Sequence, residues 1–197
     1  MNDSELIRFE ADLVIDGQEL VLQYRVVNEG HRDLYLVNRL YRTIPEWELS
    51  PNVIYVHLDA EERTIWLNKK TADIPSNVLV NSPIAPFVTP VRTGEVFEET
   101  VRLPIPVKDY RQYGKHAGGP SLQALKSEPV EVIYDRAYFT VGYFWRLNGT
   151  EEEVRDVRGQ DIVIPNAPRE AGLPEFGELQ SETWQLSVPV LEHREPN

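Results

Sequence analysis

Apolar and polar positions alternate along much of the chain, most clearly in the segment VEVIYDRAYFTVGYFWRL at residues 130–147. From Ala137 to Leu147 every second residue is apolar or aromatic, and the positions between them are mixed. A period of two predicts a strand with one buried face, and the β-branched and aromatic content agrees with it. Asn148-Gly149 then signals a tight turn. The side chains expected to fill the middle of the protein are Phe139, Val141, Tyr143 and Trp145.

The same alternation predicts strands on both sides of this segment. LIRFEADLVI and ELVLQYRVVN flank Asp16-Gly17, and NVIYVHLD and RTIWLNKK flank Ala60-Glu61-Glu62, so each pair predicts a hairpin. Further strands are expected in DLYLVNRLYR, GEVFEETVRLPIPV, DIVI and LQSETWQLSVPVLE. Short helices are expected only after Ser121 and within residues 166–172. Eight to ten strands separated by turns predict an all-β sandwich or barrel, which we assign to one domain, residues 1–197.

Proline changes the texture of the chain between residues 75 and 106, where six prolines occur. Proline cannot donate a hydrogen bond to a neighbouring strand, so this interval is expected to be edge or loop rather than central sheet. Pro104 and Pro106 end the predicted strand GEVFEETVRLPIPV, which we therefore place at a sheet edge.

Composition narrows the functional classes. The formal net charge of -12 argues against nucleic acid or anionic membranes as partners, because both attract clustered Lys and Arg. The chain has no cysteine, which excludes thiol catalysis, thiolate metal sites and disulfides. No run approaches the roughly 20 apolar residues of a membrane span, and the first residues do not resemble a signal peptide. We expect a cytoplasmic protein.

The segment D-R-A-Y-F-T-V, which begins at Asp135, resembles the D-x-A-x-Y-x-C signature of immunoglobulin domains. Asp135 and Ala137 match, whereas Phe139 stands in place of the tyrosine and Val141 in place of the cysteine. The hairpin QYRVVNEGHRDLYLVN is similar to those of bacterial immunoglobulin-like modules. The resemblance implies an immunoglobulin-like antiparallel β-sandwich with long loops and at most one or two short helices. It implies no activity, because such sandwiches serve many functions.

The loop at residues 108–128 is the best candidate for a binding site. It carries a net charge of +2, from four bases and two acids, in an otherwise acidic chain, and tyrosines lie among its bases. Tyrosine and arginine on a loop are typical of recognition surfaces, although bases that merely offset an acidic body would look the same. The expected contact residues are Tyr110, Arg111, Tyr113, Lys115 and His116.

Signals for catalysis or metal binding are weaker. His57 and Asp59 share one strand face, but a third metal ligand is not apparent, and Ser121 lacks the motif of a serine hydrolase. The acid run at residues 151–153 lacks the alternating oxygens and the glycine of a calcium loop, and a solvated hairpin arm explains it better. We therefore expect no catalytic residue, no metal and no cofactor.

The leading hypothesis is a non-enzymatic module that binds another protein through the 108–128 loop. A second hypothesis is a sandwich that binds a carbohydrate or small ligand on solvent-facing aromatic side chains. The residues nominated for that role are Tyr35, Tyr41, Tyr55 and Trp66. A third is a structural subunit that self-associates or docks through an open sheet edge, and an enzyme ranks fourth.

Overall fold

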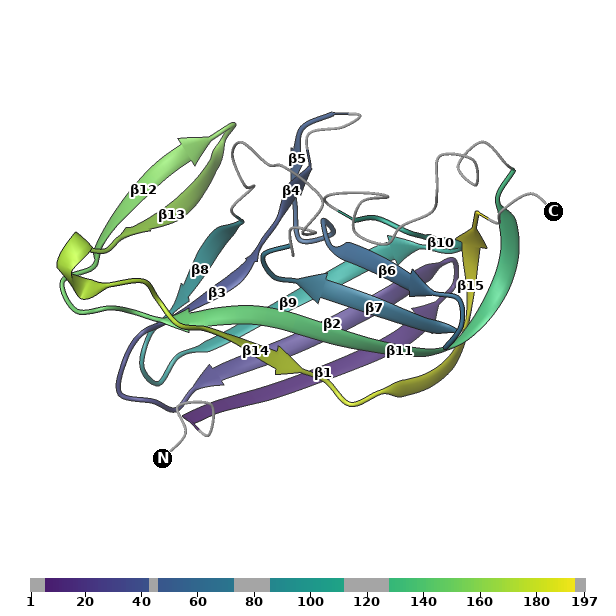
Figure 1. The fold of residues 1–197 in the computed structure, drawn as a ribbon, viewed down its shortest axis with the longest axis horizontal. Coiled ribbons are helices and arrows are strands. Elements are labelled where there is room, and N and C mark those ends of the chain that lie inside the picture. Colours follow the sequence, from purple (N-terminus) through teal and green to yellow (C-terminus); the bar gives the residue numbers. More distant parts are fainter. Residues whose placement is uncertain (1–5, 43–45, 73–85, 112–127, 194–197) are drawn as a thin grey trace.

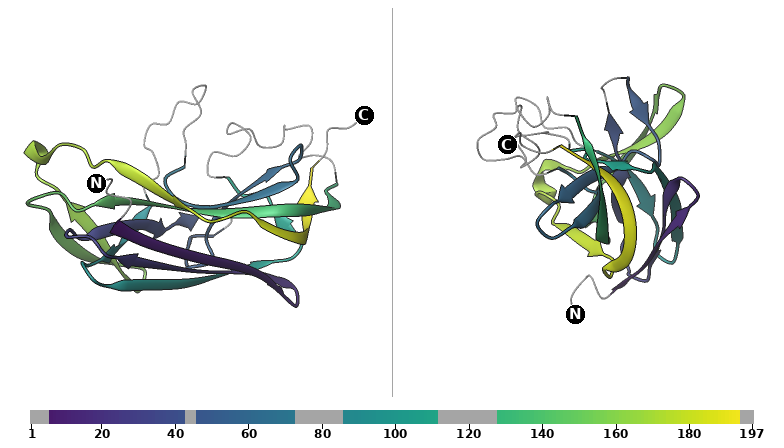
Figure 2. Two further views of the ribbon diagram at one scale, coloured as in Figure 1. Left: turned by 90° about the horizontal axis from the view of Figure 1, so that it is seen from below. Right: turned by 90° about the vertical axis from the view of Figure 1, so that its right-hand side faces the viewer.

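A three-stranded antiparallel sheet forms one layer of the protein. The computed structural model describes residues 6–42, 46–72, 86–111 and 128–193. The sheet has the order β1-β2-β9, and the bounds of its strands are Ile7–Asp16, Glu19–Asn28 and Val96–Pro104. Figure 2 shows it as a layer lying lengthwise against the rest of the strands. Its β9 edge is the one predicted for the segment that ends at Pro104.

The second layer is a larger sheet organised around β11 (Val130–Trp145), as Figure 1 shows. Its other strands are β3 (Leu34–Arg39), β6 (Tyr55–Asp59), β7 (Thr64–Lys69), β8 (Phe87–Val91), β10 (Val107–Lys108), β12 (Glu151–Val157), β13 (Gln160–Asn166), β14 (Phe176–Gln180) and β15 (Trp184–Glu192). A small hairpin pairs β4 (Tyr41–Arg42) with β5 (Glu48–Leu49), and η4 (Arg169–Ala171) is one 3₁₀ turn between Pro168 and Gly172. The prediction of an all-β fold with few helices is confirmed.

Each edge of β11 is shared between two partner strands. One edge pairs first with β15 and then with β14, both antiparallel. The other pairs with β7, which runs parallel, and then with β3, which runs antiparallel. The prediction of one strand over LQSETWQLSVPVLE is therefore wrong, because this segment forms two strands that are separated between Gln180 and Trp184. A strand as long as β11 twists along its length, and two short partners follow that twist more easily than one.

The core lies between the two layers, as the alternation in β11 predicts. Phe139 and Val141 are fully buried, and Tyr143 and Trp145 are nearly so. The Phe139 ring lies 4.8 Å from the ring of Tyr24, on the facing sheet. Burial of each such side chain contributes roughly 1.5–3 kcal/mol to folding, so these residues contribute substantially to the stability of the protein.

Two of the aromatic residues expected to face solvent are buried instead. Tyr35 is fully buried in a second cluster with Phe144, on the face of the sheet away from the main core. Tyr55 lies in a third cluster with Leu40. Both positions are out of phase with the main core, but additional chain covers this face of the sheet too. Alternation identifies the face on which a side chain lies, and does not show whether that face is covered.

The proline-rich interval contains an interior strand, contrary to the prediction. β8 lies between β3 and β13 in the larger sheet. Pro90 is opposite Tyr35 in the pairing with β3, whereas the pairing with β13 consists of Val88 opposite Val163. One pair of residues is enough to position β13 without a hydrogen-bond donor at Pro90, which explains how the strand tolerates proline.

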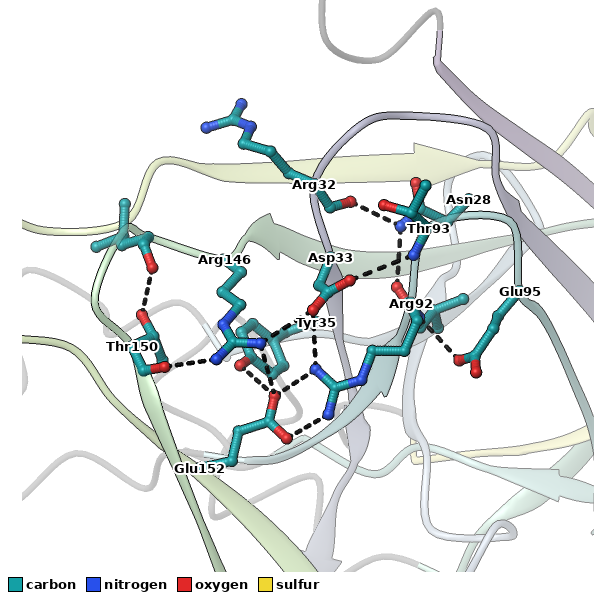
Figure 3. A network of polar contacts seen from close by, with 12 residues as sticks. Asn28, Arg32, Asp33, Tyr35, Arg92, Thr93, Glu95, Arg146, Thr150 and Glu152 are labelled. Atoms are coloured by element: carbon teal, nitrogen blue, oxygen red, sulfur yellow. Dashed lines mark hydrogen bonds and ion pairs between the residues drawn. The ribbon is translucent and has the colours of Figure 1, made fainter.

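A network of ion pairs connects Asp33, Arg92, Arg146 and Glu152, which lie in separate segments of the chain (Figure 3). Asp33 accepts hydrogen bonds of 3.0 Å from the guanidinium groups of both Arg92 and Arg146. Glu152 accepts from Arg92 and, at 2.6 Å, from the hydroxyl of Tyr35. The hydrogen bonds from Arg92 lower the pKa of Glu152 below its ordinary value, more than partial burial raises it. Two arginines balance two carboxylates, which is the arrangement of a structural clamp.

Residues 151–153 lie on an arm of the β12–β13 hairpin, and Glu151 is exposed, so the network corrects the interpretation as a solvated hairpin arm for Glu152 alone. The Glu152 side chain is only 18% exposed, and its neighbour Glu153 is paired with Arg155 on the same strand. Within the described parts of the chain, no three histidine, aspartate or glutamate side chains come together as a metal site would require.

Candidate functional site

Tyr110, the first of the expected contact residues, is part of the sheet framework. Its backbone exchanges two hydrogen bonds of 2.8 Å with Val56 in β6. Because β10 pairs with β15, β15 with β11, β11 with β7 and β7 with β6, this bridge closes a ring of strands. The Tyr110 ring is half-buried, lies 6.0 Å from that of Tyr55, and has a pKa raised by that burial. Tyr110 therefore supports the fold at the base of the loop.

Arg111 is also anchored. Its side chain is only 9% exposed, and its Nε donates to Asp109 Oδ1 at 3.0 Å. The same carboxylate oxygen accepts from the backbone N–H of Leu58, whose carbonyl accepts from Arg111 Nη2. The other three expected contact residues, Tyr113, Lys115 and His116, lie outside the described residues, as does the short helix expected after Ser121.

Beside this base, three aromatic rings form a row across three neighbouring strands. His57 in β6 is directly opposite Trp66 in β7, and Trp66 is directly opposite Tyr138 in β11. The ring centroids are 4.8 Å apart in the first pair and 5.2 Å apart in the second. We call these three residues the aromatic row. They lie on the face of the sheet away from the main core, and all three are half-buried.

Carboxylates flank the aromatic row. Burial raises the pKa of the Tyr138 hydroxyl to about 12, and the negative charges of Asp59 and Glu178 add to the effect. Glu178 is shared with Lys70, whose Nζ lies 2.8 Å from its Oε1. The row thus presents aromatic surface with acidic groups close to its Tyr138 end.

The opposite end of the row is close to Arg111. Burial lowers the pKa of His57, and the charge of Arg111 lowers it further, against the opposing charges of Asp109 and Asp59. His57 is therefore uncharged at neutral pH and serves as an aromatic surface. The base of the predicted binding loop and the aromatic row are consequently neighbours.

Only part of this surface could be anticipated from the sequence. Trp66 is among the aromatics nominated for ligand stacking, and His57 was considered as a metal ligand. Tyr138 is missed, because it falls in the mixed set of positions on the central strand. The three residues are brought together by strand register. The parallel pairing of β7 with the remote β11 cannot be recognised from local sequence.

The arrangement suits recognition better than bond-breaking chemistry. Aromatic side chains at an exposed sheet face supply contact area at a small cost in side-chain entropy, and adjacent carboxylates supply orientation. Tyr41, the remaining nominated aromatic, lies elsewhere and stacks on Phe87 at 5.3 Å.

Two further observations bear on the class of protein. No helix in the described parts of the chain is long and apolar enough to cross a membrane. No family model, no curated protein and no solved structure matches the chain.

Proposed function

We propose that this protein is a non-enzymatic binding module of immunoglobulin-like type, and that the aromatic row receives a basic segment of a partner protein. The observation that carries the proposal is the alignment of three half-exposed rings across three strands with carboxylates beside them. Tryptophan and tyrosine are the residues most often found where protein interfaces gain their energy.

Charge supports a basic partner. The chain carries a net charge of -12, and the local carboxylates near Tyr138 belong to Asp59 and Glu178. An arginine or lysine side chain laid over Trp66 would gain roughly 0.5–2 kcal/mol from its interaction with the ring. The net negative charge of the chain would also accelerate the approach of a basic partner.

The described base of the 108–128 loop lies beside the same surface. Arg111 and Tyr110 fix the place where the loop leaves the body, beside His57. Tyr113, Lys115 and His116 remain predicted contact residues.

Binding of synthetic peptides that differ only in net charge would test the proposal, with isothermal titration calorimetry as the measurement. Basic peptides should bind, with an affinity that falls as salt is raised, and acidic peptides should not. Trp66→Ala should weaken binding about tenfold, which corresponds to roughly 1.4 kcal/mol. Phe176→Ala is the matched control, because Phe176 is an aromatic residue that is 60% exposed elsewhere on the sheet.

A second variant guards against loss of structure in Trp66→Ala. Asp59 Oδ1 accepts the backbone N–H groups of Glu61 and Glu62, and the amide oxygen of Asp59→Asn can accept the same bonds. This variant should therefore fold normally and still bind basic peptides less tightly. Equal binding of all peptides, or sugar-dependent thermal stabilisation that is lost in Trp66→Ala, would overturn the proposal; the latter result would instead support the carbohydrate hypothesis.

A further inference from the structure

A polar cluster is buried between the two layers, on the opposite face of β7 from Trp66 of the aromatic row. It consists of Lys69 on β7, Asn38 on β3, and Glu99 and Tyr24 on the facing sheet. Lys69 is fully buried and Asn38 is 1% exposed, while the Glu99 side chain is 13% exposed. Burial of a lysine is costly, so a cluster that retains one requires an explanation beyond packing.

Glu99 connects the other members of the cluster. Its Oε2 accepts from Lys69 Nζ and, at 2.7 Å, from the hydroxyl of Tyr24. Its Oε1 is 3.5 Å from Asn38 Nδ2, at the limit of a hydrogen bond. The carboxylate therefore lies in reach of both the lysine amine and the asparagine amide nitrogen.

The two strands that carry Lys69 and Asn38 meet end to end along β11. Lys69 pairs with Val141, and Val37 pairs with the next residue of β11, Gly142, on the same edge. Continuing β3 by one position places Asn38 at the level of Lys69. Both side chains continue the core-facing phase of their strands, so they enter the same interlayer space.

The hydrogen bonding of Asn38 is incomplete. Among the described residues, its buried Oδ1 has no hydrogen-bond partner, although buried polar atoms are nearly always satisfied. A cavity of about 50 Å³ lies against Asn38 and Glu99. The amide thus shares Glu99 with Lys69, through a contact at the limit of a hydrogen bond, and its oxygen has no bond that would stabilise it.

Proton transfer within the cluster would make the lysine a nucleophile. Burial lowers the pKa of Lys69, against the opposing charge and hydrogen bond of Glu99. Transfer of one proton from the Lys69 ammonium to Glu99 would replace two buried charges by a neutral amine and a neutral acid. A desolvated neutral amine is the form that attacks a carbonyl carbon. Burial and the negative charge of Glu99 raise the pKa of Tyr24 well above its ordinary value, so its hydroxyl stays a donor that orients Glu99.

We propose that Lys69 and Asn38 form an intramolecular amide cross-link, with Glu99 as the proton carrier. The Lys69 Nζ lone pair forms a bond to Asn38 Cγ, and the electrons of the carbonyl move to Oδ1. Protonated Glu99 delivers its proton to Nδ2, the bond from Cγ to Nδ2 breaks as the carbonyl reforms, and the Glu99 carboxylate takes up the second proton of Nζ. The products are the cross-link and one ammonia, which takes the proton held by Glu99 and leaves as ammonium; Glu99 is then a carboxylate again, and nothing is oxidised or reduced.

The cross-link would remove the buried cation and tie β3 to β7 where β11 brings them together. This inference is independent of the binding role, because none of its residues belongs to the aromatic row. The simpler alternative is a buried ion pair of Lys69 and Glu99 with Asn38 as a neighbour, and the two differ in covalent mass.

Intact mass spectrometry of the full-length folded protein is the direct test. We expect a mass lower than that of the sequence by one ammonia, and a protease digest that contains a branched peptide joining Lys69 to Asn38. The branched peptide distinguishes the cross-link from ammonia loss at another asparagine. A folded wild-type protein that keeps its full sequence mass after prolonged incubation would overturn the proposal.

Variants locate the reaction. Lys69→Met, Asn38→Ala and Glu99→Ala should each restore the full sequence mass. The two residues that flank Lys69 provide controls of the same residue types, so Lys70→Met and Asn68→Ala should retain the loss of ammonia. Loss of ammonia that persists in Lys69→Met would contradict the assignment. Should the core variants fail to fold, the wild-type mass and digest still decide the question.

Discussion

Replacing Glu152 by alanine tests the interpretation of the ion-pair network as a clamp that stabilises the fold. The change removes the acceptor of the Tyr35 hydroxyl, which belongs to a fully buried side chain and donates at 2.6 Å. A buried hydroxyl left without an acceptor costs about 1–3 kcal/mol. The contacts to Arg92 contribute less, because its side chain is 37% exposed and solvent screens the pair to roughly 0–1 kcal/mol. We expect a total loss of about 2 kcal/mol.

Urea-induced unfolding at equilibrium measures this loss. Glu152→Gln keeps an oxygen that can accept from Tyr35, so it should cost about half as much as the alanine variant. In a double-mutant cycle with Tyr35→Phe, the coupling between the two residues should be about 1 kcal/mol. A Glu152→Ala protein within about 0.5 kcal/mol of the wild type would refute the reasoning, because changes of that size are typical of uninvolved surface positions.

Two further predictions concern pH and backbone packing. The folded-state pKa of Glu152 is lowered from 4.5, so its stabilising contribution is present above that pH and is lost as the pH falls through the depressed value. The difference in unfolding free energy between wild type and Glu152→Ala should therefore shrink in acid. A difference that stays constant with pH would contradict this. Gly177 is opposite Tyr143, and a Cβ at Gly177 would overlap the tyrosine ring. Gly177→Ala should therefore destabilise the protein by about 1–3 kcal/mol in the same urea assay. The control is Gly94→Ala, at an open turn with positive φ, which tests backbone strain alone.

The sequence was sufficient to predict the central strand because period-two alternation is local information. The inward set around Phe139 and Val141 is buried as expected, and the single turn at residues 169–171 has its predicted proline and glycine flanks. Pairing between remote strands was beyond reach. The parallel contact of β7 with β11, and the division of the last strand into β14 and β15, depend on which segments arrive side by side, and local alternation carries no information about that.

The buried polar cluster was missed for a different reason. Lys69 follows Ile65 and Leu67 in the apolar phase of its strand, and Glu99 lies between Phe97 and Val101 in the same way. A charged residue at an apolar position of the alternation resembles the end of a strand, so neither residue belongs to the predicted inward-facing positions. Such positions, together with Asn38 between Leu36 and Leu40, indicate polar side chains that enter the core.

The surface prediction was limited by the same absence of register. His57 and Trp66 drew attention separately, for metal binding and for ligand stacking. Only the alignment of β6, β7 and β11 unites them with Tyr138.

Because β11 is hydrogen-bonded to strands drawn from residues 34 to 192, its environment is incomplete until residue 192 has been synthesised. Residues 1–129 are synthesised before β11. Until β11 has been made, the apolar face of the three-stranded sheet β1-β2-β9 stays uncovered. Such long-range closure slows folding and prolongs the period in which nascent chains can aggregate. The acidic charge of the chain acts during that interval too, since mutual repulsion keeps unfinished molecules apart.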